Sequence, residues 1–389
     1  MSLPTDFVPF ARPSIGREEE DAVLEVLRSG WLTTGKVARA FEAEFASFLG
    51  VDAALAVNSA TSALHLALEA LGIGPGTKVA MSPYTFASDA ACARHLGAEV
   101  AFCDVSAEDY NIAPELLEEL LDSDPSIKAV VPVHVGGMPC RMGEILDSAR
   151  RRRIAVVEDC AHGFPLRLPE GMAGTLGDFG FYSFYATKTI TTGEGGMVVA
   201  RDEGMLKRME TMRSHGFDRG AWDRYTSKTA SWRYDVVEAG FKYNLPDLLA
   251  AVGREQLKKA DAFLAQRRAI AARYDEAFSG HRALEVPPRH AAHTWHLYSL
   301  RLRPEALRIG RDEFAERLQE AGVGISVHFI PLHLMTYWSR RYRLGPEDFP
   351  RAYDKFSRAI SLPIWQGMSE AQVDRVAQAV LDVAREVSA

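Results

Sequence analysis

The strongest constraint on the fold is a repeated alternation of short apolar runs with helical segments between residues 53 and 200. Helical periodicity appears at 61–71, 87–96, 114–121 and 142–152. Strands that alternate with helices form parallel βα units, and helices then cover both faces of the sheet. We therefore predict an α/β fold with a mostly parallel sheet of seven strands. The expected strands are 53–57, 78–81, 100–103, 129–133, 154–157, 179–183 and 196–200.

The segments that flank this alternation predict two domains. Residues 1–245 should form an N-terminal arm, with helices at 17–29 and 37–49, and a large ligand-binding domain. Residues 246–279 read as one long linking helix that opens at Pro246, a residue well tolerated in a first helical turn. A smaller α/β domain is expected over 280–389, with strands at 295–302 and 324–329 and helices at 311–321 and from 369. The aromatic-rich stretch 218–240 is long for a loop, which indicates a functional segment or a partner interface.

Composition excludes several classes of protein. A net charge of −7 argues against binding to nucleic acid, which requires a basic excess. The four cysteines include no C-x-x-C pair, so we expect free thiols in a reducing compartment. The N-terminus lacks the order of a signal peptide, and the most apolar stretch, 53–74, is too polar to span a membrane. We expect a cytoplasmic protein with no membrane partner.

Two strand ends should face the same site, because ligands of open α/β sheets bind at the carboxyl ends of the strands. The first is the turn after 53–57, and the second is the segment after 154–157, which carries Asp159. A buried carboxylate is costly unless it meets a cation. The alternative is that Asp159 caps the helix that follows.

Lys188 is the main candidate for chemistry. It lies among small, aromatic and hydroxyl residues, five positions after Ser183 and just before the glycine-rich turn 193–196. A solvated surface lysine is the alternative, but this context is not that of an exposed helix. Burial near a cation would lower the lysine pKa from its ordinary value of about 10.4 and make the amine nucleophilic. A strand-end aspartate with such a lysine suits pyridoxal 5'-phosphate (PLP), since the aspartate keeps the pyridine nitrogen protonated and the lysine carries the aldehyde as a Schiff base.

Four further positions could complete such a site. Small residues over 58–63 would let backbone N–H groups approach a phosphate at a helix N-terminus, although a plain helix cap is an equally ordinary use of this pattern. Ser183 could add a hydroxyl to the same phosphate. Phe86 could stack on the cofactor ring or be a core aromatic. His162 could contact the ring or simply begin a helix.

Two groups of histidines do not predict a metal site. His290, His293 and His296 are spaced three apart, and His328 and His333 are five apart. Neither group matches the H-E-x-x-H or Cys/His patterns of zinc proteins. We expect no metal, and we interpret 327–333 as a loop that faces the substrate.

Taken together, these motifs resemble the DegT/DnrJ/EryC1/StrS family, the PLP-dependent nucleotide-sugar aminotransferases of fold type I. The resemblance runs nearly end to end. Within the family the chain is most similar to the 4-aminotransferases of UDP-4-keto sugars, through residues 221–224, 242–247 and the pair His328–Phe329. The segments that carry the resemblance are 10–13, 30–35, 59–61, 71–76, 133–137, 158–162, 193–196 and 240–247.

The resemblance implies a role for individual residues. Lys188 would carry PLP and later move a proton between substrate and cofactor, while Asp159 would pair with the pyridine nitrogen. His162 would lie near the ring hydroxyl, where other members carry Gln. Asn244 would reach the phosphate from the neighbouring subunit, which implies a homodimer with shared active sites. The remaining implied contacts are Ala60, Thr61 and Ser183 with the phosphate, Phe86 with the ring, and Thr33, Tyr243 and His328 with the sugar or nucleotide.

The implied reaction moves an amino group from L-glutamate to a nucleotide-linked keto sugar, at C4 of a 4-keto-6-deoxyhexose or 4-keto pentose. Alternatives are a 3-keto-sugar aminotransferase, another PLP-dependent reaction such as dehydration, decarboxylation or aldol cleavage, and a non-catalytic regulator. Lys188 argues against the dehydratase branch, which has His at this position. A regulator would tolerate the loss of Lys188, Asp159 or Ser183. Cys160 and Gly163-Phe164 depart from the small residues that many members carry, and they would reshape the pocket rim.

Overall fold

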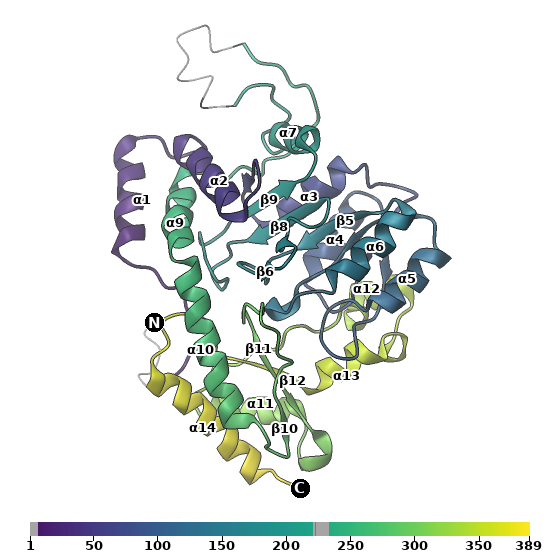
Figure 1. Cartoon of the computed structure of the whole chain (residues 1–389), viewed down its shortest axis with the longest axis vertical. Coiled ribbons are helices and arrows are strands. Elements are labelled where there is room, and N and C mark those ends of the chain that lie inside the picture. Colours follow the sequence, from purple (N-terminus) through teal and green to yellow (C-terminus); the bar gives the residue numbers. More distant parts are fainter. Residues whose placement is uncertain (1–6, 221, 223–232) are drawn as a thin grey trace.

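The computed structural model of the chain describes residues 7–220, 222 and 233–389. Its centre is a seven-stranded sheet with the strand order β1-β9-β8-β5-β4-β2-β3 (Figure 1). Only β9 runs antiparallel to its neighbours β1 and β8, so the predicted mostly parallel sheet is confirmed. The strands are β1 (Leu55–Val57), β2 (Lys78–Met81), β3 (Glu99–Phe102), β4 (Ile127–Val131), β5 (Ala155–Asp159), β8 (Phe179–Ser183) and β9 (Gly196–Ala200).

Side chains alternate along each strand between two separate cores, as the two-residue period of a strand requires. On β4, Val131 joins a core with α3 (Ala60–Ala70), α4 (Ala87–His95) and α7 (Glu203–Met212). Its neighbour Val130 faces the other side, toward α5 (Pro114–Ser123) and α6 (Met142–Arg152). Further along the same side, Met197 and Tyr182 pack against Phe41 and Phe45 of α2 (Lys36–Leu49). Helices therefore cover both faces of the sheet.

The prediction of one continuous helix over 246–279 is wrong, because the structure has two helices there, α9 (Asp247–Lys258) and α10 (Ala260–Phe278). The break falls at Lys259, whose amine lies 2.7 Å from Glu19 on α1 (Arg17–Ser29). The two helices have different partners: α9 packs on α1 and α2, whereas α10 packs on α14 (Glu370–Glu386). Residues 258–260, Lys-Lys-Ala, are ordinary helix formers, so the sequence does not mark the break.

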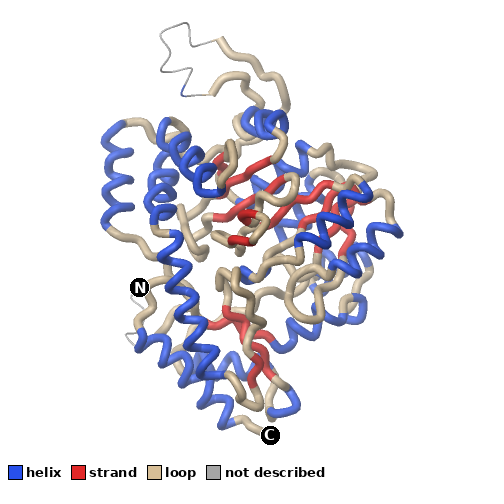
Figure 2. The backbone as a smooth tube through the Cα atoms, viewed as in Figure 1, coloured by secondary structure: helices blue, strands red, loops and turns tan. Residues whose placement is uncertain are grey.

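The C-terminal part contains a three-stranded antiparallel sheet of β10 (Leu284–Glu285), β11 (Tyr298–Leu302) and β12 (Ala359–Leu362). Its main core joins this sheet to α10, α11 (Arg311–Glu320) and α14. Of two shorter helices, α12 (Thr336–Tyr342) lies beside the large sheet, and α13 (Pro350–Arg358) lies beside the small sheet (Figure 1). Figure 2 shows the two sheets lying apart, and α10 runs alongside the small sheet (Figure 1).

Two strand predictions in this part need correction. Residues 324–329 form no strand; the segment makes a single bridge, Ser326 with Ser361. The strand predicted from residue 295 begins at Tyr298, because Thr294 and Leu297 bond instead to the carbonyls of Gly137 and Gly136. Both segments leave the small sheet to line the space between the two sheets. The division of the chain at 245 and 279 stays a prediction.

All four cysteines are free and buried, as expected. A small hairpin, β6 (Arg167–Leu168) with β7 (Gly171–Met172), completes the strands. Among the helices of residues 7–220, 222 and 233–389, none combines the length and the apolar character needed to cross a bilayer. Of the aromatic loop 218–240, Tyr225 and Trp232 lie outside the described residues, as do positions 221, 223 and 224 of the 221–224 motif.

Candidate active site

A cavity of about 570 Å³ lies where the carboxyl ends of β5 and β8 meet the N-terminus of α3. Both strand-end segments predicted to face one site contribute to it. Side chains from the C-terminal part, at 296 and 327–329, close its other side. The predicted site residues that line this cavity are Ala60, Thr61, Phe86, Asp159, His162, Ser183, Lys188 and His328.

Lys188 lies in the loop after β8, where its backbone N–H donates to the carbonyl of Tyr185 at 2.9 Å. Burial lowers the pKa of its amine to about 8, because a desolvated ammonium is disfavoured. The carboxyls of Asp159 and Asp89 act in the opposite direction, and the buried guanidinium of Arg267 adds to the lowering. The amine is therefore far easier to deprotonate than that of an exposed lysine.

Asp159 ends β5 and is 4% exposed. One carboxylate oxygen accepts the backbone N–H of Ala161 at 2.7 Å. Burial raises the pKa of the carboxyl, and the Ala161 N–H and the charge of Lys188 oppose that rise. No helix follows β5, because residues 161–165 form turns that lead to β6 (Arg167–Leu168). The helix-capping alternative for Asp159 is therefore wrong, and its bond to the Ala161 N–H closes a turn at the cavity wall.

Glu158 precedes Asp159 and points to the opposite face of the strand, where it is fully buried. Its carboxylate accepts backbone N–H groups from Gly174, Leu176 and Gly177 at 2.6–2.9 Å, and His134 Nε2 lies 3.4 Å away. His134, Glu158 and Cys160 are close enough for their side-chain donor atoms to surround an ion. The three backbone donors already occupy the carboxylate, so we interpret this cluster as an anchor for the 174–177 loop behind the site.

The N-terminus of α3 supplies an anion-binding element. Ser59 caps the helix by accepting the N–H of Ser62 at 3.0 Å, which leaves the first-turn amides of Ala60 and Thr61 without intrahelical acceptors. Gly196 makes this arrangement possible, since an added Cβ would lie 2.7 Å from the nitrogen of Ala60. The glycine-rich turn therefore lets β9 begin directly against the helix N-terminus.

Three imidazoles surround the cavity: His162, His296 and His328. His162 Nδ1 accepts the N–H of Gly136 at 3.2 Å, so its neutral ring carries the proton on Nε2. Its ring lies 4.3 Å from that of His296 and stacks on Phe329 at 5.5 Å. Burial lowers the pKa of all three, that of His328 to about 4, so all are neutral near pH 7.

His296 and Asp89 are residues of this region that the sequence analysis missed as site residues. His296 seemed to belong with His290 and His293, but its ring faces His162, and its Nδ1 is buried without a partner. Asp89, in the first turn of α4, is buried near Asp159. The sequence holds a weak signal for Asp89, a charged residue in the first turn of the apolar helix that follows β2.

Three predicted residues lie away from this cavity within the chain. Thr33 and Asn244 line a different hollow of about 390 Å³, where Asn244 donates its amide N–H to Thr34 Oγ1 at 2.7 Å. Tyr243 stacks on Phe241 with ring centroids 5.0 Å apart. The cavity itself is open at Phe86, whose side chain is 62% exposed and is thus not the core aromatic of the alternative reading.

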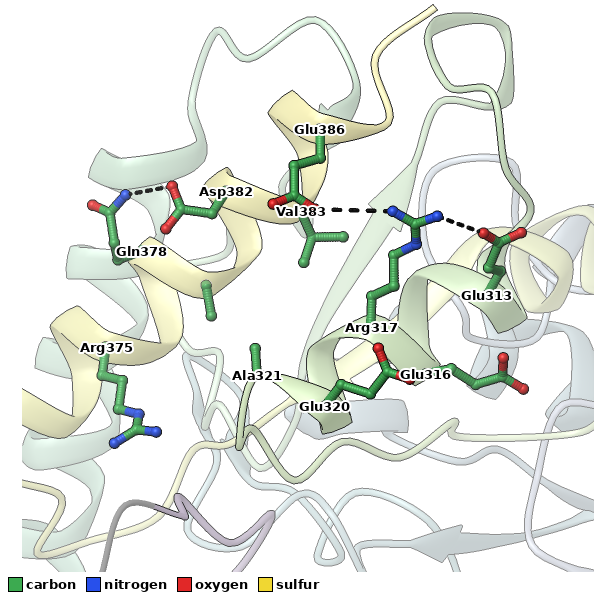
Figure 3. Close-up of a pocket in the computed structure, with 11 residues that line it drawn as sticks. Glu313, Glu316, Arg317, Glu320, Ala321, Arg375, Gln378, Asp382, Val383 and Glu386 are labelled. Atoms are coloured by element: carbon green, nitrogen blue, oxygen red, sulfur yellow. Dashed lines mark hydrogen bonds and ion pairs between the residues drawn. The ribbon is translucent and has the colours of Figure 1, made fainter.

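Another hollow, of about 930 Å³, lies between α11 and α14 (Figure 3). Charged side chains line it, and several pair with one another: Arg317 contacts Glu313 at 2.8 Å and Glu386 at 3.9 Å. Its lining residues include none from the large sheet. We interpret it as a solvated groove between two helices.

Comparison with known proteins agrees with this geometry. The model of the DegT/DnrJ/EryC1/StrS aminotransferase family matches residues 13–381. The spore coat polysaccharide biosynthesis protein SpsC of Bacillus subtilis (strain 168) is 42% identical over 382 residues, which are 97% of each chain. The structure of the putative sugar aminotransferase Spr1654 from Streptococcus pneumoniae, in its PMP-form, has a TM-score of 0.91 at 28% identity and covers 97% of this chain and 99% of its own. Helicobacter pylori PseC, an aminotransferase involved in the biosynthesis of pseudoaminic acid, has a TM-score of 0.90 at 26% identity, with 98% and 100% covered.

The fold and the lysine-centred cavity define a PLP-dependent transferase of fold type I. The chain belongs to the DegT/DnrJ/EryC1/StrS aminotransferase family. It is thus an enzyme, a PLP-dependent aminotransferase, and the resemblance seen in its motifs is confirmed.

Proposed function

We propose that this enzyme transfers an amino group from L-glutamate to a nucleotide-linked keto sugar, at C4 of a 4-keto-6-deoxyhexose or 4-keto pentose. The observation that carries the proposal is the meeting of Lys188, Asp159 and the α3 N-terminus in one cavity of a chain from this family. The names of its relatives support a sugar as acceptor: one acts in spore coat polysaccharide biosynthesis, and another is a putative sugar aminotransferase. The C4 position rests on residues 242–247 and the pair His328–Phe329.

The donor groups of the cavity fit PLP. The α3 N-terminus at Ala60 and Thr61, with the Ser183 hydroxyl on the cavity wall, suits a phosphate dianion. Asp159 supplies a carboxylate for a protonated pyridine nitrogen, and Lys188 supplies an amine of lowered pKa for the aldehyde. Phe86 would stack on the ring.

Lys188 is the base of the proposed reaction. When PLP is bound, its ring withdraws electrons from the substrate carbon that loses a proton. With PLP held by these residues, the free Nζ of Lys188 would take the proton from the substrate carbon and return it to the cofactor carbon on the other side of the shared nitrogen, which is a 1,3-shift. A pKa of about 8 suits both directions, since the group then holds or releases a proton easily near neutral pH.

His162 and His328 act as uncharged groups in this proposal. His162 lines the cavity, and the Nε2–H of its neutral ring would donate to the ring hydroxyl as an amide side chain would. His328 Nδ1 lies 3.0 Å from Ser361 Oγ, which fixes the ring at the cavity wall, and it would contact the sugar. Tyr243 and Thr33 stay proposed substrate contacts, and both would have to act across a subunit boundary.

We further propose that the active unit is a homodimer with shared sites. Asn244 and Thr33 line a hollow separate from the Lys188 cavity, so they cannot complete that cavity from within the same chain. A second subunit could cover the open side at Phe86 and bring its Asn244 to the phosphate. A shared site would explain why the residues implied by the family resemblance lie at two separate cavities of the monomer, Lys188 at one and Asn244 and Thr33 at the other.

Visible absorbance tests the proposed reaction. The yellow PLP-loaded enzyme should lose its colour with excess L-glutamate. After removal of glutamate, one member of a panel of nucleotide-linked 4-keto and 3-keto sugars should restore the colour. Restoration only by a 3-keto sugar would contradict the C4 assignment, and no change with glutamate would contradict the proposed donor.

Lys188→Ala is the matched control. We expect it to abolish turnover and to leave PLP bound without a covalent link, which mass spectrometry after borohydride reduction would show as unmodified protein. A Lys188→Ala enzyme with the wild-type rate would refute the assignment of the base.

A further inference from the structure

Arg267, on α10, is a buried guanidinium whose hydrogen bonds all go to uncharged acceptors. Its side chain is 1% exposed, and burial lowers its pKa to about 10, so the group stays charged near pH 7. Its Nη1 donates to the backbone carbonyls of Trp295, His296 and Ile364 at 2.8–3.2 Å. Its Nε donates to the side-chain oxygen of Gln366 at 3.2 Å. A buried charge without a counter-ion is costly, which makes Arg267 a candidate for a role beyond stability.

Gln366 connects this guanidinium to the loop that carries Lys188. Its side chain is 1% exposed, and its amide N–H donates to the carbonyl of Thr189 at 3.2 Å. The guanidinium requires an acceptor and the Thr189 carbonyl requires a donor, and an amide offers both at once. A carboxylate would satisfy only the first, and an ammonium only the second. Arg267 and Gln366 therefore join the backbone directly after Lys188 to the turn that carries His296.

The turn that Arg267 contacts has a strained backbone. Trp295 has a φ of 54°, in the left-handed region that residues other than glycine rarely adopt. Such a conformation persists only where its surroundings fix it. Here the N–H of Trp295 donates to His293 Nδ1 at 2.8 Å, and its carbonyl accepts from Arg267. The next residue is His296, which lines the cavity with its ring 4.3 Å from that of His162. The guanidinium thus helps to fix a strained turn at the cavity wall.

We propose that Arg267 and Gln366 are positioning residues that hold the Lys188 loop and the His296 turn at a fixed separation. Arg267 fixes the turn, and Gln366 carries that constraint to Thr189, one residue after Lys188. Neither side chain lines the cavity, so both act through the backbone. Position matters for a group that transfers a proton, because a displacement of about 1 Å lowers the rate by up to roughly 100-fold. That consequence rests on the proposed function, whereas the constraint on the two backbone segments does not.

Two substitutions separate the parts of this link. In Gln366→Glu the new carboxylate still accepts from Arg267, and beside the guanidinium it stays ionised, so it cannot donate to the Thr189 carbonyl. Arg267→Lys keeps the charge, but an ammonium lacks the planar fork that reaches all four acceptors. The matched control is Gln266→Glu, at an exposed position on α10, where the side-chain oxygen accepts the N–H of Gly367 at 2.9 Å. Glu keeps that acceptor.

Hydrogen exchange of the cofactor-free protein tests the constraint without any reaction. In Gln366→Glu the amides of residues 186–192 should exchange roughly fivefold faster or more, because the buried Thr189 carbonyl loses its donor, while residues 294–298 stay as in wild type. In Arg267→Lys both segments should exchange faster, and in Gln266→Glu neither should. Equal acceleration throughout the chain would show general destabilisation and would overturn the proposal. Unchanged exchange of 186–192 in Gln366→Glu would also overturn it.

The half-reaction of the PLP-loaded enzyme with L-glutamate gives a readout that a merely structural role would not move. At saturating glutamate, loss of the yellow colour should be roughly tenfold slower or more in Gln366→Glu, whereas the half-saturating glutamate concentration should change by less than about threefold. Arg267→Lys should be at least as slow, and a wild-type rate in this variant would show that the charge alone suffices. The double variant should be no more than about threefold slower than Arg267→Lys, because both changes break one link. Effects that multiply would overturn the link.

Failure of this proposal is distinguishable from failure of the proposed function. If the wild type does not lose its colour with glutamate, the proposed donor is wrong, and the exchange pattern of the cofactor-free protein still decides whether the constraint exists. If the wild type reacts and Gln366→Glu reacts equally fast, the positioning role fails while the proposed function stands. Should Arg267→Lys fail to fold, Gln366→Glu decides the proposal alone, since it keeps the contact to Arg267.

Discussion

Lys188 should titrate near pH 8, and this prediction can be tested without the cofactor. Burial lowers the pKa of its amine from 10.5 to about 8. At pH 7 about one Lys188 in 11 is then neutral, against about one in 3,000 for a lysine of ordinary pKa. The neutral amine is the reactive form, so Lys188 should react about 300-fold faster at pH 7 than a lysine of equal accessibility and ordinary pKa.

Competitive labelling with a small acylating reagent from pH 6 to 11 measures this midpoint in the apoprotein. The peptide that contains Lys188 is quantified against that of Lys207, whose side chain is 77% exposed. Asp159 raises the pKa of Lys188, so Asp159→Asn should move the midpoint below 8 by roughly one to three units. A wild-type midpoint near 10.5 would refute the burial argument, and an unchanged midpoint in Asp159→Asn would refute the coupling.

Three further predictions concern the support of the site. Glu158→Gln should lower the free energy of unfolding by about 3–5 kcal/mol, because three backbone donors lose a buried carboxylate. Chemical denaturation measures this free energy. The control is Glu144→Gln, an exposed position, where the expected cost is under about 1 kcal/mol. Asp247→Ala should cost about 2–4 kcal/mol, since Asp247 accepts three N–H groups at the start of α2, and an unchanged denaturation midpoint would contradict this cap. Asn244→Ala should weaken PLP retention. A mixed dimer of one Asn244→Ala subunit and one Lys188→Ala subunit should regain activity, because one of its two shared sites then has both residues intact. Activity that survives dilution to monomers would contradict shared sites.

The alternation of strands and helices was readable from the sequence because it depends on local periodicity. Each predicted strand between 53 and 200 exists, and the two strand-end segments do meet at one cavity. The errors fall where tertiary contacts decide the backbone. The helix breaks at Lys259 because α9 and α10 pack on different partners, and 324–329 leaves the small sheet to line the cavity.

The sequence by itself singled out Lys188 and Asp159, because each residue type occurs in a local context that indicates its use, and the structure places both at one cavity. Tertiary structure alone decided which distant groups join them. His296 lies 108 positions from Lys188 in the sequence, and only the bonds of Thr294 and Leu297 to the backbone at 136–137 bring it to the cavity. Tertiary structure also places Asn244 and Thr33 at a different hollow from Lys188, although the family resemblance implies one site for all three. The physical reason is that a local pattern records burial and periodicity, whereas proximity between remote carboxyls and imidazoles depends on how whole elements pack.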